Sequence, residues 1–323
     1  MNDNLRITTT GRTRLETVIP LSTPYLVFLD PSNICNQQCG FCPTGNRELI
    51  KKVGRKLEKL SFGLCLRALR QLTEFPDRIK TLRLYKDGEP LLNPDFSVMV
   101  AYAKSKNKFD NIDTTTNGTL LTHELSRQII DAGLTKIFIS VHPSNIMNPK
   151  YAREIIYFYL YSRDHGNCKV FIKTAGDYLS HDERTMFLDI YSDFCDSIAI
   201  EHTASCWPEF DVPGVNKNIG IYGQKLEPTG VDVCPYIFYS ISINSNGTVT
   251  PCFVDWQHSL TIGDLNSDRL LDIWNGEKLR GIRMAHLLKK RSQIPICKNC
   301  GQLIYGLPDN IDQHAFNIWN KIR

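Results

Sequence analysis

The sequence predicts an α/β protein built from a partial (βα)6 barrel and a following small domain with a β-hairpin and a helix. Between residues 24 and 202, short apolar or β-branched runs alternate with segments of helical periodicity. This alternation is typical of a parallel sheet with helical crossovers. Beyond residue 203 the alternation stops, and a stretch punctuated by Pro and Gly leads to hairpin and helix signals.

The barrel elements follow in chain order. Strands are expected over 24–30, 79–85, 109–118, 135–142, 168–175 and 196–202. Helices are expected over 61–75, 94–106, 122–133, 149–164 and 181–194. Asn93 is the expected N-cap of the second helix and Thr122 that of the third, which Gly133 ends. Functional residues of such barrels lie at the carboxyl ends of the strands.

The C-terminal region has its own pattern. The segment "PYIFYSISINSNGTVTPC" (235–252) reads as two strands around Ser-Asn-Gly, and 269–290 is helical in periodicity. The expected organisation has four parts: an N-terminal extension over 1–23, the barrel over 24–204, a linker over 205–230 and a small domain over 231–323.

Composition excludes several classes of protein. The chain has 323 residues, 42% of them apolar and 22% charged, and a formal charge of +4. It shows no dense basic stripe for nucleic acid, no apolar run of the ~18 residues that a membrane helix needs, and no signal peptide. We therefore expect a cytoplasmic protein without nucleic-acid or membrane partners. Eleven cysteines in such a compartment favour metal or redox chemistry over disulfides.

Three cysteines follow the first expected strand in "DPSNICNQQCGFCPTG" (30–45). They are Cys35, Cys39 and Cys42, with the spacing C-x3-C-x2-C. A four-iron cluster has four corners, so three thiolates leave one iron open to an outside ligand. A structural zinc site is the alternative, but zinc needs a fourth ligand nearby, and the nearest histidine is His123.

A second set of cysteines has the spacing C-x17-C-x44-C-x2-C in the C-terminal region. Its members are Cys234, Cys252, Cys297 and Cys300. Four thiolates complete either an iron–sulfur cluster with no open iron or a zinc site, and spacing alone does not choose the metal.

The first motif, placed after the first strand of a βα barrel, resembles the radical S-adenosylmethionine superfamily. The resemblance implies a TIM-like partial barrel with a four-iron cluster, whose open iron binds the amino and carboxylate groups of S-adenosylmethionine. Cleavage by one electron then yields a 5′-deoxyadenosyl radical that abstracts hydrogen from a C–H bond. The second set resembles SPASM domains in their shorter, twitch-type form, which implies one auxiliary four-iron cluster.

The resemblance also implies residues around S-adenosylmethionine. "YKDGEP" (85–90) stands where the family has a Gly-Gly-Glu segment that binds the methionine amino group. Asp87 replaces the first Gly, while Gly88 and Glu89 match; the ordinary alternative is a turn. The other implied contacts are Phe41 beside adenine, Asn117 after the third strand and Ser140 after the fourth. Their ordinary alternatives are a loop anchor for Phe41 and a turn for Asn117.

The substrate is less constrained than the cofactors. A single auxiliary cluster resembles the small-molecule branch of the superfamily, which acts on aminocyclitols and sugars, so we expect dehydrogenation or epimerisation of a polar carbon skeleton. The expected reductant is an external one-electron donor such as flavodoxin or ferredoxin. Glu201, His202 and Lys173 are candidate bases. The alternatives are a peptide maturase, disfavoured by the 34 residues before Cys35, and a non-enzymatic iron–sulfur or zinc protein.

Four cysteines lie outside both sets. Cys65, Cys168 and Cys195 fall in apolar patterns and are expected to pack in the core. Cys206 follows the sixth strand, at the expected catalytic end of the barrel. An epimerase must return a hydrogen atom to its substrate, and a thiol is the best donor in a protein, so Cys206 is a candidate catalytic residue. Its ordinary alternative is packing under Trp207.

Overall fold

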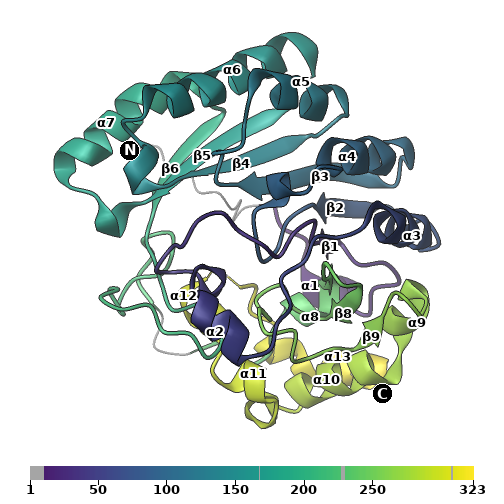
Figure 1. Ribbon diagram of the computed structural model, residues 1–323. Coiled ribbons are helices and arrows are strands. Elements are labelled where there is room, and N and C mark those ends of the chain that lie inside the picture. The colour runs from purple at the N-terminus through teal and green to yellow at the C-terminus, as the bar shows by residue number, and fades with distance from the viewer. Residues whose placement is uncertain (1–10, 167, 227–229, 307) are drawn as a thin grey trace.

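The computed structural model describes residues 11–166, 168–226, 230–306 and 308–323. Within them a single sheet has the order β6-β5-β4-β3-β2-β1-β7-β8-β9 (Figure 1). Its first six strands in the chain pair in parallel, as the sequence predicts. They are β1 (Leu26–Leu29), β2 (Ile79–Arg83), β3 (Phe109–Thr116), β4 (Lys136–Val141), β5 (Lys169–Ala175) and β6 (Ser197–Glu201).

Five helices form the predicted crossovers. They are α3 (Phe62–Leu72), α4 (Phe96–Ser105), α5 (His123–Asp131), α6 (Pro149–His165) and α7 (His181–Tyr191), and Figure 1 shows them along one face of the sheet. Alternate strand residues, such as Ile137 and Ile139 of β4, are fully buried in one core with Ile129 of α5 and Ile155 of α6. The intervening residues face the inside of the barrel, since successive side chains of a strand point to opposite faces.

One of the two predicted helix caps is confirmed. The Thr122 hydroxyl accepts a hydrogen bond from the backbone N–H of Leu125 at 3.1 Å. The cap predicted at Asn93 is wrong, because α4 begins after Asp95. The Asn93 amide instead donates to the carbonyls of Pro31 and Leu60, at 2.8 and 2.9 Å, and so joins two loops of the barrel.

The predicted hairpin is confirmed over 240–250 and extends the barrel sheet, but its expected start is wrong, because α8 (Tyr236–Tyr239) is a helical turn. The hairpin consists of β7 (Ser240–Ile243) and β8 (Thr248–Thr250), with β9 (Gly263–Asp264) beside β8. Gly247 lies in the turn with a φ of +92°, which favours glycine. Strand β7 also pairs in parallel with β1. The barrel and the C-terminal region therefore share one sheet, and the domain boundaries stay a prediction.

The predicted helix over 269–290 is two helices, α9 (Leu270–Asn275) and α10 (Glu277–Leu287), which are separated by Gly276 in extended conformation. The remaining α-helices are α1 (Leu15–Val18), α2 (Arg47–Lys52), α8 (Tyr236–Tyr239), α11 (Pro295–Lys298), α12 (Gln302–Tyr305) and α13 (Ala315–Ile322). A second core joins the N-terminal extension to this region through Leu15, Phe238 and Ile318. In the described part of the chain, no helix is long and apolar enough to cross a bilayer.

Candidate active site and auxiliary metal centre

The first cysteine set lies in the loop after β1, as predicted. The loop is tightly folded: the Cys42 N–H donates to the Cys39 carbonyl at 3.1 Å, and a Cβ on Gly45 would lie 2.4 Å from the Cys39 oxygen. Burial, with smaller contributions from the neighbouring Cys42 and Cys35, raises the pKa of the Cys39 thiol to about 12. Binding of a metal to these cysteines would release their thiol protons.

The loop offers the environment that an iron–sulfur cluster requires. The Gln37 N–H lies 3.5 Å from the Cys35 sulfur, and the Asn117 amide lies 3.9 Å from it. Hydrogen bonds to sulfur tune such clusters. Among the described residues, no three His, Cys, Asp or Glu side chains converge on one point as ligands of a single ion would. Cluster thiolates bind different irons and need not converge. All eleven cysteines are free thiols.

Gly88 and Glu89 follow β2 and lie directly against the chain that leads to Cys35. The Glu89 N–H donates to the Ile34 carbonyl at 2.8 Å. A Cβ on Gly88 would lie 2.3 Å from that carbonyl oxygen and 2.4 Å from the Ser32 oxygen. Only glycine permits this approach, so the predicted cofactor segment and the cysteine loop form one packed unit.

The Glu89 carboxylate is held in a fixed orientation and is only 2% exposed. It accepts hydrogen bonds from the Thr116 hydroxyl at 2.6 Å and from the N–H groups of Asn117 and Leu91 at 2.7 and 3.1 Å. Burial raises the pKa of Glu89 to about 7, although these three donors act in the opposite direction. The site thus presents a preorganised acidic group beside the cysteine loop.

The other predicted cofactor residues differ in their distance from this unit. Asn117, at the end of β3, reaches the cysteine loop through a 2.8 Å hydrogen bond to Asn36. Ser140 lies in β4, in register with Lys173 of β5. The Phe41 ring stacks on Tyr178 of η4 (Gly176–Tyr178), with centroids 5.9 Å apart. The structure thus gathers Gly88, Glu89 and Asn117 around Cys35, while Phe41 packs toward the end of β5.

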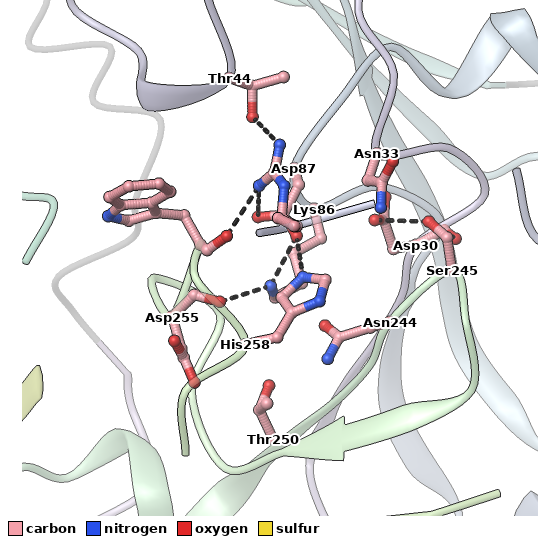
Figure 2. Close-up of polar contacts among 12 residues, drawn as sticks. Asp30, Asn33, Thr44, Lys86, Asp87, Asn244, Ser245, Thr250, Asp255 and His258 are labelled. Atoms are coloured by element: carbon pink, nitrogen blue, oxygen red, sulfur yellow. Dashed lines mark hydrogen bonds and ion pairs between the residues drawn. The ribbon is translucent and has the colours of Figure 1, made fainter. Parts of the chain in front are cut away.

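Asp87, which replaces a glycine of the family motif, is buried among cationic and polar groups (Figure 2). Its carboxylate lies 2.8 Å from Lys86 Nζ, 2.7 Å from His258 Nε2 and 3.8 Å from Arg55. Burial alone would raise the pKa of this carboxyl, but Lys86, His258 and Arg55 outweigh burial and hold it well below its usual range. The replacement is therefore accommodated as an ionised member of a buried network.

Arg55 connects this network to both cysteine sets. Its guanidinium donates to the Thr44 hydroxyl and to the Trp256 carbonyl, each at 2.8 Å. Thr44 follows Cys42, and Trp256 lies in the loop after Cys252. Sequence reasoning missed Arg55, Lys86 and His258. The available signal was Asp87 itself, because a buried carboxylate requires cationic partners.

The four members of the second cysteine set line one cavity, although they are far apart in sequence. They are Cys234, Cys252, Cys297 and Cys300. Burial, with a smaller contribution from Cys300, raises the pKa of Cys234 and of Cys297 to about 12. Four thiols that line one cavity fit a cluster whose irons are all bound by protein.

Cys206 lies beside this second set. It is 6% exposed, and its carbonyl oxygen is 4.0 Å from the Cys300 sulfur. The turn after Cys300 packs on the same segment, since a Cβ on Gly301 would overlap the Ser205 carbonyl oxygen. The chain between β6 and the second set therefore forms part of the wall of the auxiliary centre.

The inside of the barrel contains paired charges and aromatic rings. Arg83 of β2 lies 3.4 Å from Asp113 of β3, and Lys173 of β5 lies 2.8 Å from Glu201 of β6. Phe28 of β1 stacks on Phe253, with ring centroids 5.0 Å apart. Of the candidate bases, Glu201 and Lys173 thus pair with each other, whereas His202 Nδ1 lies 2.8 Å from Asp177.

Two family models match the chain. The model of the radical S-adenosylmethionine superfamily matches residues 29–178. The model of SPASM, an iron–sulfur cluster-binding domain, matches residues 234–301. The chain belongs to the radical S-adenosylmethionine superfamily. It is an enzyme of this superfamily that uses S-adenosylmethionine and two iron–sulfur clusters, and the non-enzymatic alternative is set aside.

Known members resemble the chain over most of its length. The S-adenosyl-L-methionine-dependent 2-deoxy-scyllo-inosamine dehydrogenase of Niallia circulans is 21% identical over 89% of this chain and 96% of its own. The structure of BtrN in complex with AdoMet and 2-DOIA has a TM-score of 0.57 at 16% identity, covering 89% of this chain and 97% of that one. Streptococcus suis SuiB bound to precursor peptide SuiA has a TM-score of 0.62 at 17% identity, covering 83% and 69%. These structural likenesses show the fold.

Proposed function

We propose that this radical S-adenosylmethionine enzyme dehydrogenates an alcohol carbon of a small polar substrate, of sugar, cyclitol or nucleotide-sugar type. The main support is the pair of cysteine centres, whose loops Arg55 joins through hydrogen bonds to Thr44 and Trp256. Dehydrogenation requires an acceptor for an electron from the substrate, and a fully protein-bound cluster is suited to that role. The similarity to an inosamine dehydrogenase along nearly the whole chain points to the same class.

The proposed roles follow from the positions of the side chains. Cys35, Cys39 and Cys42 would hold the cluster with the open iron, and Glu89 would accept a hydrogen bond from the amino group of S-adenosylmethionine. Further cofactor contacts are proposed for Phe41, Gly88, Asn117 and Ser140. When bound, the reduced cluster and S-adenosylmethionine supply a 5′-deoxyadenosyl radical that removes a hydrogen atom from the substrate carbon.

The remaining steps concern the protein. After the hydrogen atom has left, an alcohol carbon becomes a carbonyl by losing one proton from the hydroxyl and one electron. Cys234, Cys252, Cys297 and Cys300 would hold the auxiliary cluster that accepts the electron. Glu201, which lies 2.8 Å from Lys173 near the carboxyl ends of β5 and β6, would accept the proton. The ion pairs inside the barrel suit a substrate rich in hydroxyl or amino groups. An external flavodoxin or ferredoxin would supply the first electron.

Two alternatives remain distinct from this proposal. Epimerisation needs a hydrogen donor in contact with the substrate carbon, and Cys206 is the candidate. Cys206 is only 6% exposed and lies beside Cys300, so its thiol is poorly accessible to a substrate, and this favours dehydrogenation. Peptide modification is the second alternative, since SuiB, which has a similar fold, was solved with its precursor peptide.

We expect anaerobic incubation with reductant, S-adenosylmethionine and a panel of cyclitols, aminosugars and nucleotide sugars to give 5′-deoxyadenosine and a product two mass units lighter than its substrate. Mass spectrometry detects both. Cys206→Ala should lose little of this activity. If the product instead has the mass of the substrate and inverted configuration, and Cys206→Ala no longer forms it, the reaction is epimerisation and not dehydrogenation. Turnover with cysteine-containing peptides alone would establish the maturase.

The iron content tests the two-cluster assignment. The anaerobically reconstituted protein should bind about eight irons, since seven cysteines would hold two four-iron clusters. Substituting all four auxiliary cysteines by Ala should reduce this to about four irons. Iron and zinc are measured by plasma mass spectrometry. One zinc with about four irons in the wild-type protein would contradict the auxiliary cluster.

The pH dependence of S-adenosylmethionine binding tests Glu89. Its pKa of about 7 means that the free carboxyl gains a proton as the pH falls below 7. A hydrogen bond from the amino group favours the carboxylate, so binding must first remove that proton. We expect affinity to fall about fivefold from pH 7 to pH 6 through this group alone, because the ionised fraction of the carboxyl falls by about that factor.

Glu89→Gln is the matched control, because it keeps the shape of the side chain without its titration. It should bind about ten- to a hundredfold more weakly at pH 8, as expected for a lost charge-assisted hydrogen bond. Its affinity for S-adenosylmethionine should also depend less on pH, because the variant lacks the one proton that Glu89 gains at low pH. Equilibrium binding at pH 6, 7 and 8 measures both effects. Identical pH profiles for the two proteins would remove Glu89 from the cofactor site.

A further inference from the structure

His286 is a fully buried histidine of α10 that neither the sequence motifs nor the proposed mechanism uses. It lines the same cavity as the four auxiliary cysteines. A fully buried polar ring is unfavourable unless its nitrogens have hydrogen-bond partners. The hydrogen-bond partners of its two nitrogens therefore show which kind of group the cavity can bind.

The hydrogen bonds of His286 fix which nitrogen carries the proton. The backbone N–H of Cys234 donates to Nδ1 at 3.3 Å, so Nδ1 is the acceptor. A neutral imidazole with Nδ1 as acceptor has its proton on Nε2. In the part of the chain that the structure describes, Nε2 is buried and has no hydrogen-bond partner. The ring thus offers one unused N–H donor at the cavity of the four thiols.

We propose that His286 Nε2–H donates a hydrogen bond to a sulfur of the auxiliary cluster and raises the reduction potential of that cluster. The inference rests on the proposed assignment of the four cysteines. Reduction adds one negative charge to the cluster, so an N–H donor stabilises the reduced form more than the oxidised form. His286 would thereby help the auxiliary cluster accept an electron from the substrate. Because Cys234 is one of the cysteines, the same ring would also position its loop.

The test is a redox titration of the reconstituted holoenzyme, followed by electron paramagnetic resonance. His286→Phe keeps a ring in the cavity without a donor and should make reduction of the auxiliary cluster about tenfold less favourable, which is a decrease of about 59 mV for one electron. His286→Gln keeps an amide donor and should recover at least part of the decrease. Unchanged potential in His286→Phe would overturn the proposal.

Gln302→Met is the matched control. Gln302 lines the same cavity, but its amide donates to the Tyr236 hydroxyl at 3.2 Å. Its replacement should leave the potential unchanged; a decrease equal to that of His286→Phe would mean that any disturbance of the cavity suffices, which also overturns the proposal. A wild-type protein with about four irons would instead contradict the auxiliary cluster itself.

A measurement on the wild-type enzyme tests the same hydrogen bond if the variants fail to bind iron. Wild-type protein labelled with ¹⁵N-histidine should show a weak coupling between the reduced auxiliary cluster and one nitrogen in pulsed electron paramagnetic resonance. Unlabelled protein is the reference. Absence of this coupling in a protein with a full iron content would overturn the hydrogen bond.

Discussion

Replacement of Cys35, Cys39 and Cys42 by Ala is expected to abolish formation of 5′-deoxyadenosine. These are the three cysteines of the loop after β1, and Glu89 and Asn117 lie against that loop. Without their thiolates no cluster can deliver an electron to S-adenosylmethionine, so the loss should reach the detection limit. The measurement is chromatography of anaerobic reactions with reductant, followed by mass spectrometry.

The same triple variant should keep about four irons, because the auxiliary cysteines lie in a separate cavity. Cys195→Ala is a suitable control, since Cys195 lies outside both sets and packs at the periphery of the main core. It should form 5′-deoxyadenosine at nearly the wild-type rate. Cleavage at the wild-type rate in the triple variant would refute the active-site assignment.

Most of the barrel could be predicted because its signals are local. In each βα unit, a short apolar run is followed by a segment of helical periodicity. Thr122 and Gly133 mark the two ends of α5 to within a few residues. The error at Asn93 has the same origin. Asn93 has a good cap residue type, but Pro31 and Leu60, which are distant in sequence, use its amide. A tertiary contact thus overrides a local preference.

The cysteine sets could be predicted from spacing, whereas their surroundings could not. Arg55 lies in a basic stretch that reads as solvated, yet it is buried and bonded to Trp256, about two hundred residues later. His286 falls within a helical pattern where a polar residue usually faces water, but α10 packs it against Cys234. Both contacts depend on how β7 joins the sheet beside β1, and no local signal specifies that pairing.

The two cysteine centres are held by different kinds of contact, and this difference bears on function. The first loop is held by close backbone approaches at Gly45 and Gly88. The contact between the two centres is a buried ionic network around Asp87 and Arg55. A glycine contact fails if any side chain is added, while an ionic network fails if one partner is removed. Gly88 is therefore the position where the smallest change should have a large effect.

Gly88→Ala is expected to weaken S-adenosylmethionine binding strongly and to lower cluster occupancy. The new methyl group would lie 2.3 Å from the Ile34 oxygen and 2.4 Å from the Ser32 oxygen, so the chain before Cys35 must move. Such overpacking costs about 1–3 kcal/mol, which corresponds to roughly five- to 150-fold in affinity if the strain falls on the cofactor site. Gly63→Ala is the control, because a methyl group there meets nothing within 4 Å. Iron content and equilibrium binding should be unchanged in the control, and an unchanged affinity in Gly88→Ala would show that the segment can move without affecting the cofactor.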